Sequence, residues 1–175
     1  MKKYDNFQEL ENILNKIYED LEFSYDIEWE INKASYIGYF LDDEIMIDIS
    51  EIEKNIWFYK FFRLDPTTDS YTTELNATEL YDYEKKTNIL GTIKNSINFF
   101  LENENPTSLY FTALDESKGR KNIYELFCIE MKKHNYQYVV YKNEGKYLYI
   151  IYNDIDCIKK IKDYFIKKYN IVFGR

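Results

Sequence analysis

The spacing of apolar residues changes along this chain of 175 residues, and the change restricts the folds that it can adopt. From Phe23 to Ile31, apolar residues alternate with polar ones, which is the pattern of a strand with one buried face. From Leu90 to Leu101, apolar residues recur every three or four positions, as they do along one face of a helix. The sequence therefore predicts antiparallel strands in the first half and helices mixed with strands in the second, which is an α+β fold.

The first half is predicted to hold one helix followed by a run of strands. The helix covers 6–21, where Asn6 and Glu9 give a start like a capping box. Asp42-Asp43 forms a hairpin turn, and the segment over 55–64 is a central strand because it is aromatic on both faces. The expected strands, of which the last is a weaker strand or a loop, are 23–31, 35–41, 44–50, 55–64 and 71–83.

The second half is predicted to alternate helices with strands. The expected elements are a helix from Asn88 to 103, a strand over 108–114, a helix over 120–134, a hairpin of 136–142 and 146–152 across Asn143-Glu144-Gly145, a helix that starts at Asn153 or Asp154, and an edge strand over 171–173. We expect one domain over 1–175, made of an acidic half (1–87) and a second half (88–175). Its mixed, mostly antiparallel sheet is flanked by helices, and an extra helix ends the chain.

Charge is divided unevenly between the two halves. Residues 1–87 hold 21 acids and 9 bases, whereas residues 88–175 hold 10 acids and 14 bases. Such asymmetry is typical of a chain with a partner-binding surface, although solvated faces of strands and helices also differ by chance. The acidic, aromatic first half is the candidate contact region. Its candidate residues are Glu28, Trp29, Glu30, Asp42, Asp43 and Glu44.

The residue counts argue against several kinds of catalytic and cofactor site. A single histidine, His134, leaves no basis for a His-rich metal site, and Asp42–Glu44 is expected to be the solvated tip of a hairpin. Phosphate-binding loops need closely spaced glycines, and no two of the five glycines lie within six residues. Cys128 and Cys157 have apolar neighbours, so we expect buried, unpaired thiols. We expect no cofactor and no metal.

No segment has the length and hydropathy of a membrane span. The longest apolar stretch, Tyr147–Tyr152, is far shorter than the roughly 20 residues that cross a bilayer. Lys2 and Lys3 are followed by acids rather than by an apolar run, so no secretory signal is expected. These features predict a soluble protein of a reducing cytoplasm without a membrane partner.

The segment Ser117-Lys118-Gly119-Arg120 is the candidate for binding an anion. It stands where a predicted strand leads into a predicted helix, so free backbone N–H groups and the helix dipole favour negative charge there. The chain has 20 lysines but only three arginines, and arginine suits planar, two-pronged contacts. The structural alternative is an ion pair from Arg120 to Asp115 or Glu116.

Residues 88–152 are predicted to run helix, strand, helix and then two antiparallel strands. Three short motifs lie within them: Asn88–Ile93, Phe111-Thr112-Ala113, and Arg120 followed by Ile123-Tyr124. This order resembles the C-terminal half of the GCN5-related N-acetyltransferase (GNAT) fold, and the motifs are similar to those of small phage-encoded GNAT-like proteins. The resemblance implies a GNAT-like sheet.

The resemblance also implies which chemistry to look for. Acetyltransferases of this family hold the CoA pyrophosphate in a glycine-containing turn that begins with Arg or Gln, and the matching residues here, 85–90, contain no glycine. Tyr124 matches the position of the family's frequent general acid. A GNAT-type N-acyltransferase that uses acetyl-CoA, with Tyr124 as acid and Lys118 or Arg120 on phosphate, is therefore the alternative to a chain without catalytic residues.

Isoleucine, lysine, tyrosine and asparagine make up 77 of the 175 residues, and their A/T-rich codons indicate a low-GC genome. Composition and resemblance together predict a non-catalytic phage or mobile-element protein that binds a host protein through its acidic, aromatic face. The expected partner is a basic nucleic-acid-handling or defence enzyme, which the chain inhibits, because clustered carboxylates imitate a phosphate backbone. Direct binding of nucleic acid is not expected. A structural virion component is a second alternative.

Overall fold

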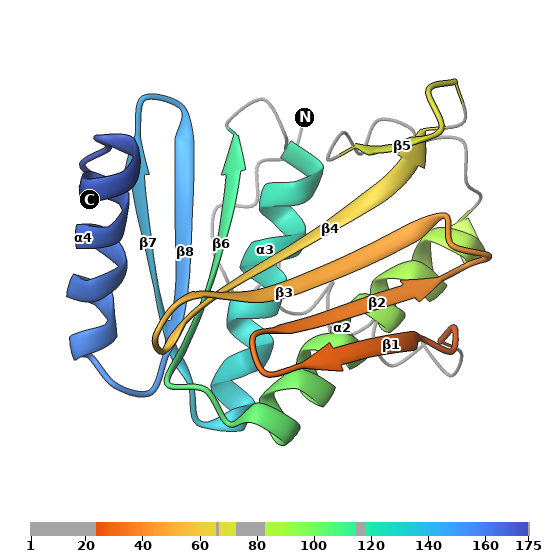
Figure 1. Cartoon of the computed structure of the whole chain (residues 1–175), viewed down its shortest axis with the longest axis horizontal. Helices are drawn as coiled ribbons and strands as arrows, with labels where there is room; N and C mark the ends of the chain where they lie inside the picture. The colour runs from red at the N-terminus through yellow and green to blue at the C-terminus, as the bar shows by residue number, and fades with distance from the viewer. Residues whose placement is uncertain (1–23, 66, 73–82, 115–117, 175) are drawn as a thin grey trace.

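The computed structural model describes residues 24–175 apart from four stretches: 66, 73–82, 115–117 and 175 (Figure 1). The predicted helix over 6–21 lies outside the described residues, as does most of the predicted segment over 71–83. The elements are, in chain order, β1 (Glu28–Asn32), β2 (Ser35–Phe40), β3 (Ile45–Glu53), β4 (Ile56–Asp65), β5 (Ser70–Thr72), α2 (Tyr83–Glu104), β6 (Ser108–Leu114), α3 (Lys118–Met131), the short 3-10 helix η2 (Lys132–His134), β7 (Gln137–Asn143), β8 (Lys146–Tyr152) and α4 (Asp156–Tyr169).

Both halves of the chain contribute to one eight-stranded sheet. Its order is β1-β2-β3-β4-β6-β8-β7, and β5 pairs with β4 beside this path. Every pairing is antiparallel except that of β4 with β6. The predicted α+β class, the mostly antiparallel mixed sheet and the C-terminal helix are confirmed. The elements α2, β6, α3, β7 and β8 follow one another in the predicted order.

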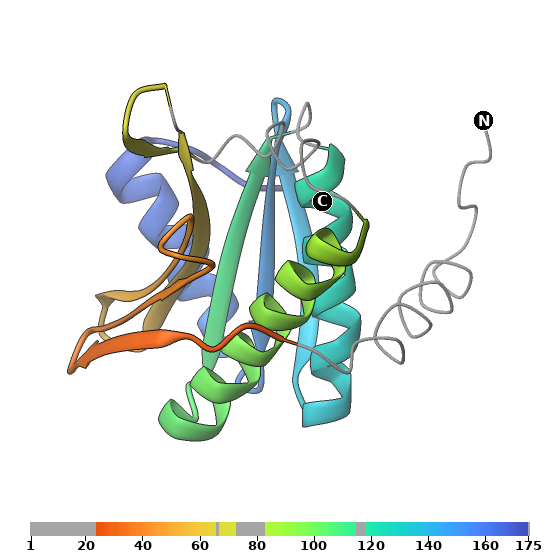
Figure 2. The same cartoon turned by 90° about the vertical axis from the view of Figure 1, so that its right-hand side faces the viewer.

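Helices cover the two faces of the sheet unequally (Figure 2). On one face, which we call the inner face, α2 and α3 bury a large core with the strands; its fully buried members include Ile47, Tyr59, Ile93, Phe111, Phe127 and Tyr149. On the opposite or outer face, α4 buries Ile161 and Phe165 against Tyr110 and Ile150. Each such side chain contributes roughly 1.5–3 kcal/mol when it leaves water, so these contacts fix the positions of the helices.

The two halves of the sheet meet where β4 runs parallel to β6. This pairing covers only two residue pairs, Trp57 with Leu109 and Phe58 with Tyr110. The rings of Phe58 and Tyr110 stack on the outer face, with centroids 4.7 Å apart and planes 6° apart. Because the backbone pairing is short, the stacked rings add to the contact between the two halves.

Several predicted boundaries differ from the observed ones. Helix α2 begins at Tyr83 rather than Asn88, so Asn88 is not a cap; its carbonyl accepts a hydrogen bond from the Thr92 hydroxyl at 2.7 Å. The first described strand begins at Glu28 rather than at residue 23. Helix α4 starts at Asp156 rather than at Asn153 or Asp154, and the Asp156 N–H donates a hydrogen bond to the Asp154 carboxylate at 3.0 Å. In place of an edge strand over 171–173, a single bridge joins Lys142 to Gly174.

The two predicted hairpin turns are confirmed. Asp42 and Asp43 adopt φ of 52° and 63° between β2 and β3. Glu144 and Gly145 adopt φ of 43° and 78° between β7 and β8. Positive φ at both central residues matches the twist of the flanking strands, and Asp and Gly are common residues for it.

Gly38 of β2 makes close contact between two strands possible. It pairs with Trp29 of β1 on the inner face. A Cβ atom placed at Gly38 would lie 2.7 Å from Ile27 Cγ2 and 3.0 Å from Trp29 Cζ3. Any larger side chain would therefore have to displace Ile27 and the Trp29 indole.

We predict that Gly38→Ala lowers the free energy of unfolding by about 1–3 kcal/mol, because overpacking displaces the Trp29 ring. Gly174→Ala is the matched control, since a Cβ atom there meets nothing within 4 Å. Urea unfolding followed by tryptophan fluorescence measures both variants. Equal unfolding midpoints for the two variants would contradict the close packing of Gly38 against Trp29.

Buried tyrosines predict a loss of stability at high pH. Burial, aided by a hydrogen bond and the charge of Glu104, raises the pKa of Tyr36 to about 12, and the Tyr36 hydroxyl donates to Glu104 Oε2 at 2.9 Å. Burial also raises the pKa of Tyr110 and Tyr149. The folded chain retains these protons at a pH where the unfolded chain loses them, so stability is full below about pH 10 and falls above it.

We expect the free energy of unfolding to fall between about pH 10 and pH 12, and to fall less steeply in Tyr36→Phe. Urea unfolding at a series of alkaline pH values, followed by circular dichroism, measures this slope. The control is Tyr169→Phe, because Tyr169 is 52% exposed. A slope unchanged by Tyr36→Phe would show that this phenol does not resist ionisation in the folded chain.

Candidate functional site

Glu28 and Glu30 lie on the outer face of β1, which is an edge strand of the sheet. Both are exposed, and they pair across the strands with Tyr39 and Ile37 of β2, which are half-buried. Directly paired residues of antiparallel strands project from the same face. The two predicted contact acids therefore flank a pair of apolar side chains on one surface.

Trp29 lies on the opposite face from these two acids. Its indole stacks on the Phe99 ring of α2, with centroids 5.1 Å apart, and meets the Tyr36 ring edge-on at 6.2 Å. Successive side chains of a strand point to opposite faces. This placement removes Trp29 from the surface that carries Glu28 and Glu30, and gives it a packing role on the inner face.

The surface of Glu28 and Glu30 continues across β3 and β4. Tyr39 pairs with Met46, which pairs with Phe62. Ile37 pairs with Asp48, which pairs with Lys60. These two rows form a surface that we call the open face; its residues are Glu28, Glu30, Ile37, Tyr39, Met46, Asp48, Lys60 and Phe62.

No helix among the described residues packs over the open face (Figure 1). Its four apolar side chains, Ile37, Tyr39, Met46 and Phe62, belong to neither of the two buried clusters. Helix α4 covers the outer face only over β6, β7, β8 and the adjoining end of β4. The outer face is therefore divided into a half that α4 covers and a half-buried apolar half that no described helix covers.

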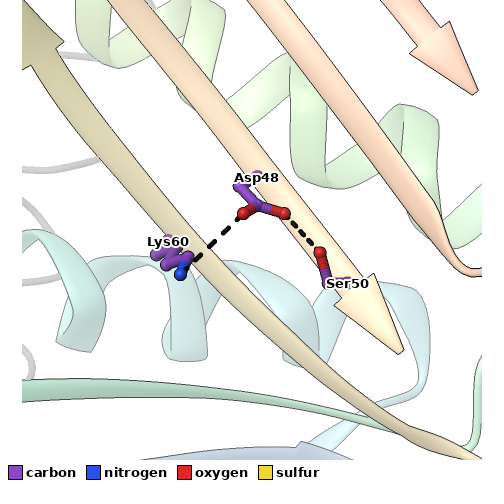
Figure 3. Close-up of polar contacts among 3 residues, drawn as sticks. All are labelled: Asp48, Ser50 and Lys60. Atoms are coloured by element: carbon purple, nitrogen blue, oxygen red, sulfur yellow. Dashed lines mark hydrogen bonds and ion pairs between the residues drawn. The ribbon is translucent and has the colours of Figure 1, made fainter. Parts of the chain in front are cut away.

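Asp48 and Lys60 form the polar centre of the open face (Figure 3). Lys60 Nζ lies 3.8 Å from Asp48 Oδ2, and the Ser50 hydroxyl donates to the other carboxylate oxygen. The same ammonium lies 5.4 Å and 5.2 Å from the ring centroids of Phe58 and Phe62. The one basic side chain of the open face is thus held by Asp48 and two rings, whereas Glu28 and Glu30 remain available at the edge.

The turn that contains Asp42 and Asp43 lies at the same end of the sheet as Glu28, because Glu28 pairs with Tyr39 close to the end of β2. Both aspartates are exposed, whereas Glu44 is half-buried and its N–H donates to the Leu41 carbonyl at 3.0 Å. The Tyr71 hydroxyl donates to the Asp43 carbonyl. Burial, together with the Asp43 charge, raises the pKa of Tyr71. The turn therefore extends the acidic edge of the open face.

The predicted anion-binding segment is only partly described. Ser117 lies outside the described residues, and Lys118–Arg120 form the first turn of α3. The helix thus starts two residues earlier than predicted. Anion binding by this segment stays a prediction.

Tyr124 lies within the inner core. It is 1% exposed, and its ring stacks on Phe111 at 4.9 Å between centroids and meets Tyr149 at 5.8 Å. A general acid must come within hydrogen-bond reach of its substrate. Burial among these rings favours a packing role for Tyr124. The stretch that matches the CoA loop, residues 85–90, is helical in α2.

The two cysteine thiols are buried and unpaired, as the sequence predicts. Cys128 and Cys157 are buried and form no disulfide. Burial raises the pKa of the Cys128 thiol, which keeps it protonated and unreactive. Within the described part of the chain, no three His, Cys, Asp or Glu residues are placed to hold a metal ion.

One cleft, which the sequence did not reveal, lies between α4 and the turn from β3 to β4. Its volume is about 450 Å³. Its charges are mixed, and Asp163 is paired with Lys159 at 2.9 Å. The lining residues are Glu53, Lys54, Asn55, Ile56, Lys160, Asp163, Tyr164 and Lys167. None of the predicted site residues lies in this cleft.

Comparison with protein families and with curated proteins found no match to this chain. Across the described residues, no helix has the length and apolar character needed to cross a membrane. The open face unites predicted acids with apolar side chains that no described helix covers, and the Tyr71 ring of β5 packs beside Tyr39 at one end of it, with centroids 6.5 Å apart.

Proposed function

We propose that this protein binds another protein through the open face and carries out no catalysis there. The observation that carries the proposal is the absence of a covering helix from half of the outer face in the described structure. A single half-buried apolar residue on a surface needs no explanation, but a contiguous group rimmed by charge is typical of an interaction site.

The composition of the open face supports a protein partner with positive charge. Tyr39, Met46 and Phe62 are residue types that are enriched at protein interfaces. Glu28 and Glu30 border them, and Asp42 and Asp43 extend the acidic edge. Opposite charge at the rim of an interface speeds encounter and selects the partner. A basic surface is therefore the best complement.

The biological form that we propose is a cytoplasmic phage or mobile-element protein that inhibits a nucleic-acid-handling or defence enzyme of its host. Enzymes that hold nucleic acid have basic surfaces, and clustered carboxylates compete for them. The succession α2, β6, α3, β7 and β8 supports a GNAT-like scaffold for this role. On this proposal, the GNAT-like scaffold serves to present the open face and does not catalyse acyl transfer.

Neutralising the acidic edge should remove partner binding. The variant Glu28→Gln/Glu30→Gln/Asp42→Asn/Asp43→Asn and the unmodified chain are each immobilised and exposed to lysate of a low-GC bacterial host. We expect the variant to capture at least tenfold less of the partner than the unmodified chain does, because each weakened contact at the acidic edge lowers the affinity further. Quantitative mass spectrometry measures the captured proteins.

The matched control neutralises four exposed acids away from the open face: Glu53, Glu84, Glu102 and Glu144. This control has the same net charge change and should capture the partner normally. Circular dichroism confirms that both variants fold. Equal capture by the unmodified chain and the edge variant would refute the role of the acidic edge.

A further inference from the structure

This inference rests on the proposed function, which does not define the shape of the partner. The half of the outer face that α4 covers shows what kind of element packs on this surface. There, α4 lies on the outer face and buries Ile161, Tyr164 and Phe165 against β6 and β8. The open face is the continuation of that surface across β4 and β3. We infer that the open face binds a basic amphipathic helix of the partner.

The width of the open face suits one helix. It spans the four strands β1 to β4, and neighbouring strands lie about 4.8 Å apart, so its outer strands are about 14 Å apart. A helix with its side chains is about 10–12 Å across. One helix that lies along the strands therefore covers the row of Tyr39, Met46 and Phe62 and leaves the acidic edge at its side.

The chemistry of the open face defines the two sides of that helix. Tyr39, Met46 and Phe62 form an apolar row across β2, β3 and β4, and a helix that lies along the strands must present apolar side chains where it crosses this row. Glu28 and Glu30 stand at one edge of the row and complement lysine or arginine beside the stripe. Such a helix would bury apolar residues at helical spacing against the open face, as amphipathic helices do when they bind an apolar surface of a partner.

Helix α4 of a second copy does not meet this description. The apolar stripe of α4 is already buried, and its exposed side carries mainly charge, including Lys159, Lys160 and Lys167. Placing those ammonium groups of a second copy over Tyr39 and Met46 would cost desolvation without apolar contact. The amphipathic sequence over 6–21 has four acids and one base, so its charge repels the acidic edge. The occupant therefore comes from a different protein.

A synthetic peptide tests this inference on the full chain. The probe is a fluorescein-labelled 18-residue helix of leucine and lysine, with leucine at helical spacing. We expect saturable binding by fluorescence anisotropy. We also expect at least tenfold weaker binding to Met46→Asp, which disrupts the apolar row, and to Glu28→Lys/Glu30→Lys, which reverses the edge. Glu102→Lys/Glu144→Lys is the matched control and should bind as the unmodified chain does.

Two further peptides separate helix recognition from charge alone. One has the same composition in a shuffled order without a stripe, and the other replaces lysine with glutamate; neither should bind measurably. Equal affinity for the shuffled peptide, or unchanged affinity in both open-face variants, would overturn the inference. A chain that sediments as a dimer and becomes monomeric in Glu28→Lys/Glu30→Lys would assign the face to a second copy, and would also overturn it.

Failure of the peptide test differs from failure of the proposed function. If the lysate partner is still lost on neutralising the acidic edge while the peptide does not bind, the partner uses another structure to contact the same surface. If neither the peptide nor the lysate partner depends on the edge acids, the proposed function itself is wrong.

Discussion

The short parallel contact between β4 and β6 is the constraint on which the rest of the structure depends. Only two residue pairs join the strands, and the stacked rings of Phe58 and Tyr110 cover the junction on the outer face. On the inner face, Tyr59 and Phe111 meet edge-on, with centroids 5.5 Å apart. The rings on both faces of this single junction therefore help to hold the two halves of the sheet together.

The position of α4 in the chain explains why the outer face is uneven. Helix α4 follows β8 directly in the chain, and its apolar stripe packs onto β8, β6 and the near end of β4. Beyond that point, Lys60 takes the place that an apolar side chain would fill, and it is held by Asp48 and two rings. The chain thus satisfies the polar centre of the open face internally, and the apolar row and acidic edge are the parts that we propose contact a partner.

The sequence predicted much of this arrangement, because strand alternation and helical spacing are local signals. The α+β class, the hairpin turns and the buried cysteines follow from such signals. The alternation over 23–31 already predicted one buried face, on which Trp29 lies opposite Glu28, although the prediction grouped Trp29 with the acids. Lys60 was missed because β4 is aromatic on both faces. Which half of the outer face α4 covers depends on contacts between distant residues, which no local pattern encodes.

The most direct test of an uncovered open face compares two methionines of the free chain. Met46 lies on the open face and is half-buried, whereas Met131 is 1% exposed in the inner core. Oxidation by dilute hydrogen peroxide, followed by peptide mass spectrometry, reports how accessible each sulfur is. Met46 should oxidise at least tenfold faster than Met131. If the two oxidise equally slowly in the folded chain, the open face is covered in solution and is not a free binding surface.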